Sequence, residues 1–147
     1  MNDRGFVYVI HIGTTPEKLW EALTSGEFTS QYWGGRRIDS DWQVGSPVKH
    51  VKPDGGIDWQ GEVLECNPPQ KLAYTFYDPA DARQAAAPSR VVMTISSSGP
   101  ETVMLHILHD RLTEKELQAI SMGWPAILSN LKSLLERGTP LAYHWSG

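Results

Sequence analysis

The chain has 147 residues, of which 40% are hydrophobic, and this predicts one globular domain over residues 1–147 with a real core. Thirteen basic and seventeen acidic residues give a net charge of -4 without a basic cluster, which argues against nucleic acid or a membrane surface as a partner. No segment has the length of a membrane span or the form of a signal peptide, and Cys66 has no second cysteine to pair with. We therefore expect a soluble, cytoplasmic protein.

The first quarter of the chain predicts one strand followed by two short helices. Aromatic and β-branched residues fill Phe6–Ile12, which predicts the strand. Thr15 and Pro16 then have the form of an N-cap followed by proline in the first helical turn. A Ser-Gly pair at 25–26 should end this helix, and Glu27–Trp33 predicts one or two further helical turns.

Six more strands are expected, separated by short turns rich in glycine and proline. They are Arg37–Trp42, Pro47–Val51, Asp58–Cys66, Lys71–Tyr77, Arg90–Ser96 and Thr102–His109. The stretch 78–88 predicts a loop with a short helical turn around 82–87. In the strand Asp58–Cys66, the alternation of side chains places Trp59 and Glu65 on the same face as Val63. The sequence leaves open which face of this strand points into the interior.

A long helix over Thr113–Arg137 is the element around which the others should assemble. Its apolar residues recur at spacings of three and four and so form one stripe, which consists of Leu117, Ile120, Trp124, Ile127, Leu128, Leu131, Leu134 and Leu135. Thr113 and Glu116 have the form of a capping box at its start. Gly138 can close the helix in the left-handed conformation.

This order of elements predicts an α+β fold. A curved antiparallel sheet of about seven strands should wrap around the C-terminal helix, with two short helices between the first two strands. The core should span about residues 6–138, followed by a tail at 139–147. Because a strongly twisted sheet closes poorly around one helix, we expect an interior cavity between the two.

Several motifs resemble those of a known superfamily. They are Thr14-Thr15-Pro16-Glu17-Lys18-Leu19-Trp20-Glu21-Ala22-Leu23-Thr24, Tyr32-Trp33-Gly34, Gly61-Glu62-Val63-Leu64-Glu65, Asn67-Pro68-Pro69-Gln70-Lys71-Leu72, Tyr74-Thr75-Phe76 and Gly123-Trp124-Pro125. Their order resembles that of the START-related helix-grip proteins, the SRPBCC superfamily, and of its branch similar to activator-of-heat-shock-protein-90-ATPase homologues. The resemblance implies a helix-grip (START/Bet v-like) fold with a deep hydrophobic pocket. It implies no single activity, because members include ligand carriers, polyketide cyclases and co-chaperone domains.

Residues on the elements that should surround this interior are the candidate ligand-binding residues. We expect the wall of the cavity to include Trp33, Trp59, Tyr74, Phe76, Met93, His109, Trp124 and Leu128. Rigid aromatic faces hold apolar or aromatic ligands well, and a ring nitrogen or hydroxyl can fix their orientation. Ordinary core packing is the alternative for each of these residues.

His109 is the one weak candidate for catalysis. If Leu105 and Ile107 face the helix, alternation places His109 inward, where an imidazole can act as a general base or bond a polar ligand group. The alternative is a buried histidine bonded to a neighbouring carbonyl. The five histidines include no pair at helical ligand spacing, so we expect no metal, and no motif predicts a cofactor.

Two classes of function are open. The one we favour is a non-enzymatic protein that binds a small hydrophobic or aromatic molecule, because no catalytic constellation is recognisable. The other is an enzyme of cyclase, hydrolase or isomerase type in which His109, Tyr74 or Glu65 handles protons. The resemblance adds a co-chaperone-like interaction domain as a third. The tail at 139–147 carries aromatic rings and predicts either packing on its own domain or a homodimer contact.

Overall fold

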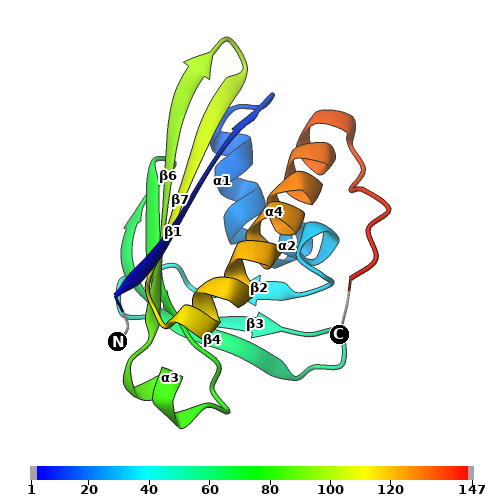
Figure 1. The fold of residues 1–147 in the computed structure, drawn as a ribbon. Coiled ribbons are helices and arrows are strands. Elements are labelled where there is room, and N and C mark those ends of the chain that lie inside the picture. The colour runs from blue at the N-terminus through cyan, green and yellow to red at the C-terminus, as the bar shows by residue number, and fades with distance from the viewer. Residues whose placement is uncertain (1–2, 146–147) are drawn as a thin grey trace.

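A computed structural model describes residues 3–145 and shows a curved sheet with a long helix across its concave face (Figure 1). All strand pairs are antiparallel, in the order β1-β7-β6-β5-β4-β3-β2. In chain order the elements are β1 (Arg4–Ile12), α1 (Pro16–Thr24), α2 (Gly26–Tyr32), β2 (Arg37–Asp39), β3 (Pro47–Val51), β4 (Ile57–Asn67), β5 (Lys71–Phe76), α3 (Ala82–Ala86), β6 (Ser89–Gly99), β7 (Thr102–Leu112) and α4 (Glu114–Arg137). The predicted α+β architecture is confirmed.

Helix α4 begins and ends where the sequence predicts. The Thr113 hydroxyl accepts from the Glu116 amide at 3.2 Å, and the Glu116 carboxylate accepts from the Thr113 amide at 2.8 Å. These two bonds form the capping box and satisfy two amides of the first turn. Gly138 closes the helix with a φ of 82°. The buried face of α4 starts at Trp124 and continues through Leu128, Leu131 and Leu134.

The two short helices lie between β1 and β2 in the chain, where α1 packs against α2 and α2 packs against α4 (Figure 1). Thr15 is the N-cap of α1, because its hydroxyl accepts from the Lys18 amide at 3.2 Å, and Pro16 occupies the first helical position. The hydroxyl of Tyr32 in α2 donates to the backbone oxygen of Ala22 in α1 at 2.8 Å. This buried bond fixes α2 against α1 and so positions Trp33, the residue that follows α2.

Strand β2 is shorter than predicted. It ends at Asp39, although the sequence pattern extends the strand to Trp42. Trp42 has a φ of 56°, in the left-handed region, and its amide donates to the Ser40 hydroxyl at 3.0 Å. Its indole N–H donates to the backbone oxygen of Thr24 at 2.8 Å. The chain therefore leaves the sheet early because Trp42 turns to bond the end of α1.

The predicted common face of Trp59 and Glu65 is wrong. Val63 pairs with Tyr74, but Glu65 pairs with Ala73, so the register of β4 against β5 shifts by one residue between them. An irregularity of this kind turns the following side chains to the other face of the sheet. Trp59 and Val63 consequently face the interior, whereas Glu65 is exposed and lies 3.4 Å from the Lys71 ammonium.

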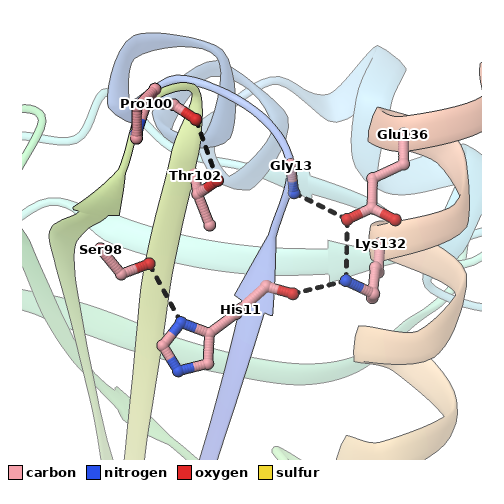
Figure 2. Close-up of polar contacts among 7 residues, drawn as sticks. All are labelled: His11, Gly13, Ser98, Pro100, Thr102, Lys132 and Glu136. Atoms are coloured by element: carbon pink, nitrogen blue, oxygen red, sulfur yellow. Dashed lines mark hydrogen bonds and ion pairs between the residues drawn. The ribbon is translucent and has the colours of Figure 1, made fainter.

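Side chains of α4 cover part of the free edge of the sheet (Figure 2). Strand β1 is an edge strand, and edge strands expose backbone groups that can pair with other chains. The Lys132 ammonium donates to the backbone oxygen of His11 at 2.6 Å and to the Glu136 carboxylate at 2.7 Å. The same carboxylate accepts from the Gly13 amide at 2.7 Å, and the bonds from Lys132 and Gly13 lower the pKa of Glu136. The end of β1 is thereby held to α4.

We expect Glu136→Ala to lower the free energy of unfolding by about 1 kcal/mol. The substitution removes the acceptor of the Gly13 amide and the partner of Lys132, and both groups are partly exposed. Urea denaturation at neutral pH measures the change. Glu21→Ala, an exposed position on α1, is the matched control and should stay within about 0.5 kcal/mol of the wild type. Equal values for the two variants would show that this contact does not hold β1.

The C-terminal tail packs on its own domain. The amide of Leu141 donates to the Asn130 side chain at 3.0 Å, and a Cβ placed on Gly34 would lie 3.5 Å from the Trp145 indole. Figure 1 shows the tail returning from the end of α4 towards the ends of β2 and β3. Tyr143 remains 47% exposed. The homodimer contact stays a prediction, and residues 146–147 of the expected tail lie outside the described residues. No helix among residues 3–145 is long and apolar enough to cross a bilayer.

Candidate functional site

Seven rings meet in the interior between the sheet and α4. We refer to them as the ring cluster, which consists of Trp33, His50, Trp59, Tyr74, Phe76, His109 and Trp124. Six of these residues belong to the wall predicted from the sequence. The other two predicted residues, Met93 and Leu128, are buried in the same hydrophobic core. The structure therefore brings all eight predicted residues to one interior.

Alternation along the strands directs the cluster inward. On β3 the exposed residues Pro47 and Lys49 alternate with the buried residues Val48 and His50. His50 pairs directly with Trp59 on β4, and a pair of this kind projects on the same face of the sheet. The same rule places Tyr74 and Phe76 of β5 and His109 of β7 inward. Trp124 faces them from α4.

Five of the rings form a closed circuit. The centroid distances are 5.2 Å for Trp33–His50, His50–Phe76 and Phe76–His109, 6.1 Å for His109–Trp124 and 5.4 Å for Trp124–Trp33. The interplanar angles lie between 63° and 87°, so each contact is edge to face, an arrangement that aromatic rings prefer. Trp59 stacks on Phe76 at 4.7 Å, and Tyr74 lies 6.4 Å from His50. The rings contact one another, so a guest molecule must separate at least one pair.

His109 has both ring nitrogens bonded. The Trp124 indole N–H donates to His109 Nδ1 at 3.1 Å, and an indole nitrogen can only donate. His109 is therefore neutral with its proton on Nε2, and this N–H donates to the Ser89 hydroxyl at 2.8 Å. The Ser89 hydroxyl in turn donates to the backbone oxygen of Phe76. This chain of hydrogen bonds links α4 to β7, β6 and β5 through residues of the ring cluster and Ser89.

The three polar residues predicted as candidates for proton transfer, His109, Tyr74 and Glu65, are poorly placed for that role. Burial lowers the pKa of His109 from 6.5 to about 4, against a smaller opposite effect of Asp110, and neither nitrogen of His109 is free. Burial also raises the pKa of Tyr74 well above its usual value, and Glu65 is on the outer face. A catalytic role for His109 stays a prediction, and it requires the bonds to Trp124 and Ser89 to break.

His50 is fully buried, and neither of its ring nitrogens has a hydrogen-bond partner among the described residues. Burial, and to a smaller extent the positive charge of Arg36, lowers the pKa of His50 from 6.5 to about 3, so the ring is neutral at physiological pH. A buried polar group without a partner costs about 1–3 kcal/mol. Native proteins leave few such groups, and those that exist call for an explanation.

His50 and Ser89 are not among the site residues predicted from the sequence. The alternation of exposed and buried residues in Pro47–Val51 is a signal that could have placed His50 on the inner face with Val48. Ser89 is the first residue of β6, one position before the predicted start of that strand, and no local pattern marks it. Its role follows from the pairing of β6 with β5 and β7, which only the assembled sheet specifies.

Two hollows stand out on the described part of the chain, and neither is lined by the ring cluster. One, of about 730 Å³, lies between the start of α1, the β4–β5 turn and β6, with Pro16, Pro69 and Ile95 in its wall. The other, of about 420 Å³, is lined by Asp3, Arg4, Thr113 and Glu114. Among residues 3–145 no three His, Cys, Asp or Glu side chains lie close enough together to hold a metal ion.

Comparison with known proteins places the chain in a sequence family. The family model described as Activator of Hsp90 ATPase homolog 1-like protein matches residues 13–136. This range runs from the end of β1 to the last turn of α4, so it contains every residue of the ring cluster. No curated protein matches the sequence.

Solved structures share the fold. An HSP90 activator from Plasmodium falciparum, PFC0360w, is 19% identical, with 89% of this chain and 95% of that chain covered and a TM-score of 0.77. The protein MLL2253 from Mesorhizobium loti is 28% identical, with 90% and 96% covered and a TM-score of 0.73. The Aha1 dimer from Colwellia psychrerythraea is 19% identical, with 92% and 98% covered and a TM-score of 0.73.

Proposed function

The chain belongs to the Activator of Hsp90 ATPase homolog 1-like family, and from that premise we propose that it binds a small hydrophobic or aromatic molecule between the sheet and α4 without catalysing a reaction on it. The observation that carries this proposal is the closed circuit of five rings in that interior. Flat rings from α4, from the residue that follows α2 and from three strands offer a guest several faces on which to stack.

The contact between Trp33 and Trp124 is the place where we propose that the circuit opens. It is the pair in the circuit that joins α4 to the end of α2, since the other four contacts involve a ring on the sheet. Sheet residues are held by backbone pairing on both sides, so they move less easily than a helix that packs through side chains. Separation of Trp33 and Trp124 would admit a flat molecule to the faces of Phe76 and His50.

The first half of α4 is less buried than the second half, which supports this opening. No residue of α4 before Trp124 is buried, although Leu117 and Ile120 lie on its apolar stripe. Pro125 cannot donate a hydrogen bond to Ser121, and a Cβ placed on Gly123 would meet nothing within 4 Å. The helix is thus weakest beside Trp124, and its first half can move while the second half stays in the core.

A thermal unfolding experiment with 2-naphthol as the probe tests the proposal. At a concentration ten times its Kd, the probe should stabilise the protein by about 1.4 kcal/mol, which raises the unfolding midpoint by about 3–5 °C. Trp59→Leu removes the ring that stacks on Phe76 and should weaken binding about tenfold. Trp20→Leu is the matched control, because Trp20 is also half-buried but belongs to α1.

Two results would contradict the proposal. One is no shift of the midpoint by 2-naphthol or by naphthalene up to their solubility limits. The other is an equal loss of binding in Trp59→Leu and Trp20→Leu, which would place the probe outside the ring cluster. Circular dichroism confirms in each case that the variant is folded.

Interaction with another protein is the second candidate. It is favoured by the family, by the HSP90 activator among the structural matches, and by the apolar edge strand β1, on which Val7 is 56% and Val9 46% exposed. Stimulation of an Hsp90 ATPase by the purified chain, lost in the double variant Val7→Lys and Val9→Lys, would support this function. Because a dimeric structure is among the matches, the solution mass should be measured in the same experiments.

A further inference from the structure

We infer that His50 selects the ligand, and that the molecule bound in the ring cluster is an uncharged aromatic compound with a hydroxyl on the ring as hydrogen-bond donor, of the phenol and naphthol class. The inference rests on the proposed binding function and specifies its ligand. The imidazole of His50 is 0% exposed and touches the rings of Trp33, Tyr74 and Phe76. Any molecule stacked among these rings lies beside the imidazole.

The surrounding rings cannot satisfy His50 in either tautomer. A neutral imidazole has one nitrogen that donates and one that accepts. The donor can point at a ring face, since Trp33 and Phe76 both meet His50 edge to face at 5.2 Å, and an N–H over an aromatic face is a weak hydrogen bond. The acceptor nitrogen needs a donor, and no described residue supplies one. The ligand therefore has to bring a hydrogen-bond donor.

The buried surroundings of His50 disfavour a charged ligand group. Burial disfavours any charge in this interior, and Arg36 already places a positive charge near His50. The guanidinium of Arg36 is paired with Asp58, its Nε lying 2.8 Å from the carboxylate, so it has a partner other than a ligand. A neutral hydroxyl or N–H group on an aromatic ring meets these conditions, whereas an ammonium does not.

His109 is a second buried imidazole of the ring cluster, and both of its nitrogens have hydrogen-bond partners within the protein. It lies 5.2 Å from Phe76, as His50 does, and it is equally buried. Its acceptor nitrogen receives the indole N–H of Trp124, and its donor nitrogen reaches Ser89. His50 differs from His109 in lacking both the donor that Trp124 gives to His109 and the partner that Ser89 provides. A ligand hydroxyl that donates to the acceptor nitrogen of His50 would take the place that the Trp124 indole has at His109.

The test compares 2-naphthol with naphthalene, which has the same ring system without the hydroxyl. Calorimetric or NMR titration gives the Kd of each probe for the wild type and for His50→Phe, in which a ring of similar shape lacks both nitrogens. In the wild type we expect 2-naphthol to bind about tenfold more tightly than naphthalene. In His50→Phe this preference should disappear, because 2-naphthol loses affinity while naphthalene keeps it.

A control variant and a second measurement distinguish failure of the His50 inference from failure of the proposed binding function. Ser133→Ala removes a buried hydroxyl on the second half of α4, outside the ring cluster, and should leave the preference unchanged. In ¹⁵N NMR of the wild type, 2-naphthol should shift one imidazole nitrogen of His50 and leave His109 unchanged. If both probes bind but the preference survives in His50→Phe, the inference is overturned and the proposed function stands. If neither probe binds the wild type, the proposed function itself fails. Should His50→Phe not fold, His50→Leu takes its place.

Discussion

Gly61→Ala is expected to lower the free energy of unfolding by about 3 kcal/mol or more. A Cβ at this position would lie 1.6 Å from the backbone oxygen of Thr75 and 2.5 Å from its carbonyl carbon. Backbone atoms of β5 are held by their pairing with β6, so they cannot move aside as a flexible side chain can. Strand β4 would have to separate from β5, and the stack of Trp59 on Phe76 would be disturbed with it.

Denaturation followed by tryptophan fluorescence measures this loss, and Gly123→Ala is the matched control. Gly123 lies within α4, and a Cβ at this position would meet nothing within 4 Å. Alanine there should therefore stabilise the protein by about 0.5–1 kcal/mol through its better helix propensity. The two substitutions are chemically identical and should act in opposite directions. A Gly61→Ala protein within about 1 kcal/mol of the wild type would show that β4 and β5 are not in close contact at this point.

The stability of the protein should fall steeply on acidification. His50 and His109 have folded-state pKa values of about 3 and about 4, both below the unfolded value of 6.5. Between pH 6.5 and these folded-state pKa values, the two histidines bind protons in the unfolded chain but not in the folded chain. Their contribution to stability is therefore fully present above pH 6.5 and is lost as the pH falls. Each histidine contributes a slope of up to about 1.4 kcal/mol per pH unit. Together they should remove about 5 kcal/mol between pH 7.5 and pH 4.5.

Unfolding free energies at a series of pH values, for the wild type and His50→Phe, measure this dependence. Removal of one buried imidazole should halve the loss, to about 2.5 kcal/mol over the same range. The difference between the two proteins isolates His50 from carboxylates such as Asp110 and Glu136, whose pKa values are also lowered in the folded state. Parallel curves for wild type and variant would mean that His50 is solvated in the folded protein.

Periodicity and end signals in the sequence were sufficient for most of the fold. The stripe of α4, its capping box and the left-handed Gly138 all follow from local pattern, and each is confirmed. The sequence failed where long-range contacts override local preference. Strand β2 is cut short because Trp42 bonds Thr24 of α1, and Glu65 faces outward because of a register shift against β5. The residues next to Trp42 and Glu65 in the sequence do not indicate that Trp42 bonds Thr24 or that β4 shifts its register against β5.

The members of the candidate site could be predicted from local sequence patterns, but their hydrogen bonds could not, because those bonds depend on long-range contacts. Aromatic residues on elements around one interior could be collected from the sequence, and the structure places them in contact. The bonding state of each histidine could not be predicted, because it depends on Trp124 and Ser89 for His109 and on the lack of such partners for His50. The cavity stays a prediction, since the rings that should line it close on one another.

The most direct test is to locate a bound aromatic molecule by NMR. Isotope-filtered NOEs between 2-naphthol and the labelled protein report which side chains lie within a few ångströms of the probe. We predict NOEs to the rings of Trp33, Phe76 and Trp124, with the naphthol ring between the sheet and α4. NOEs confined to Pro16, Pro69 and Ile95, in the hollow beside α1, would contradict the binding site described above.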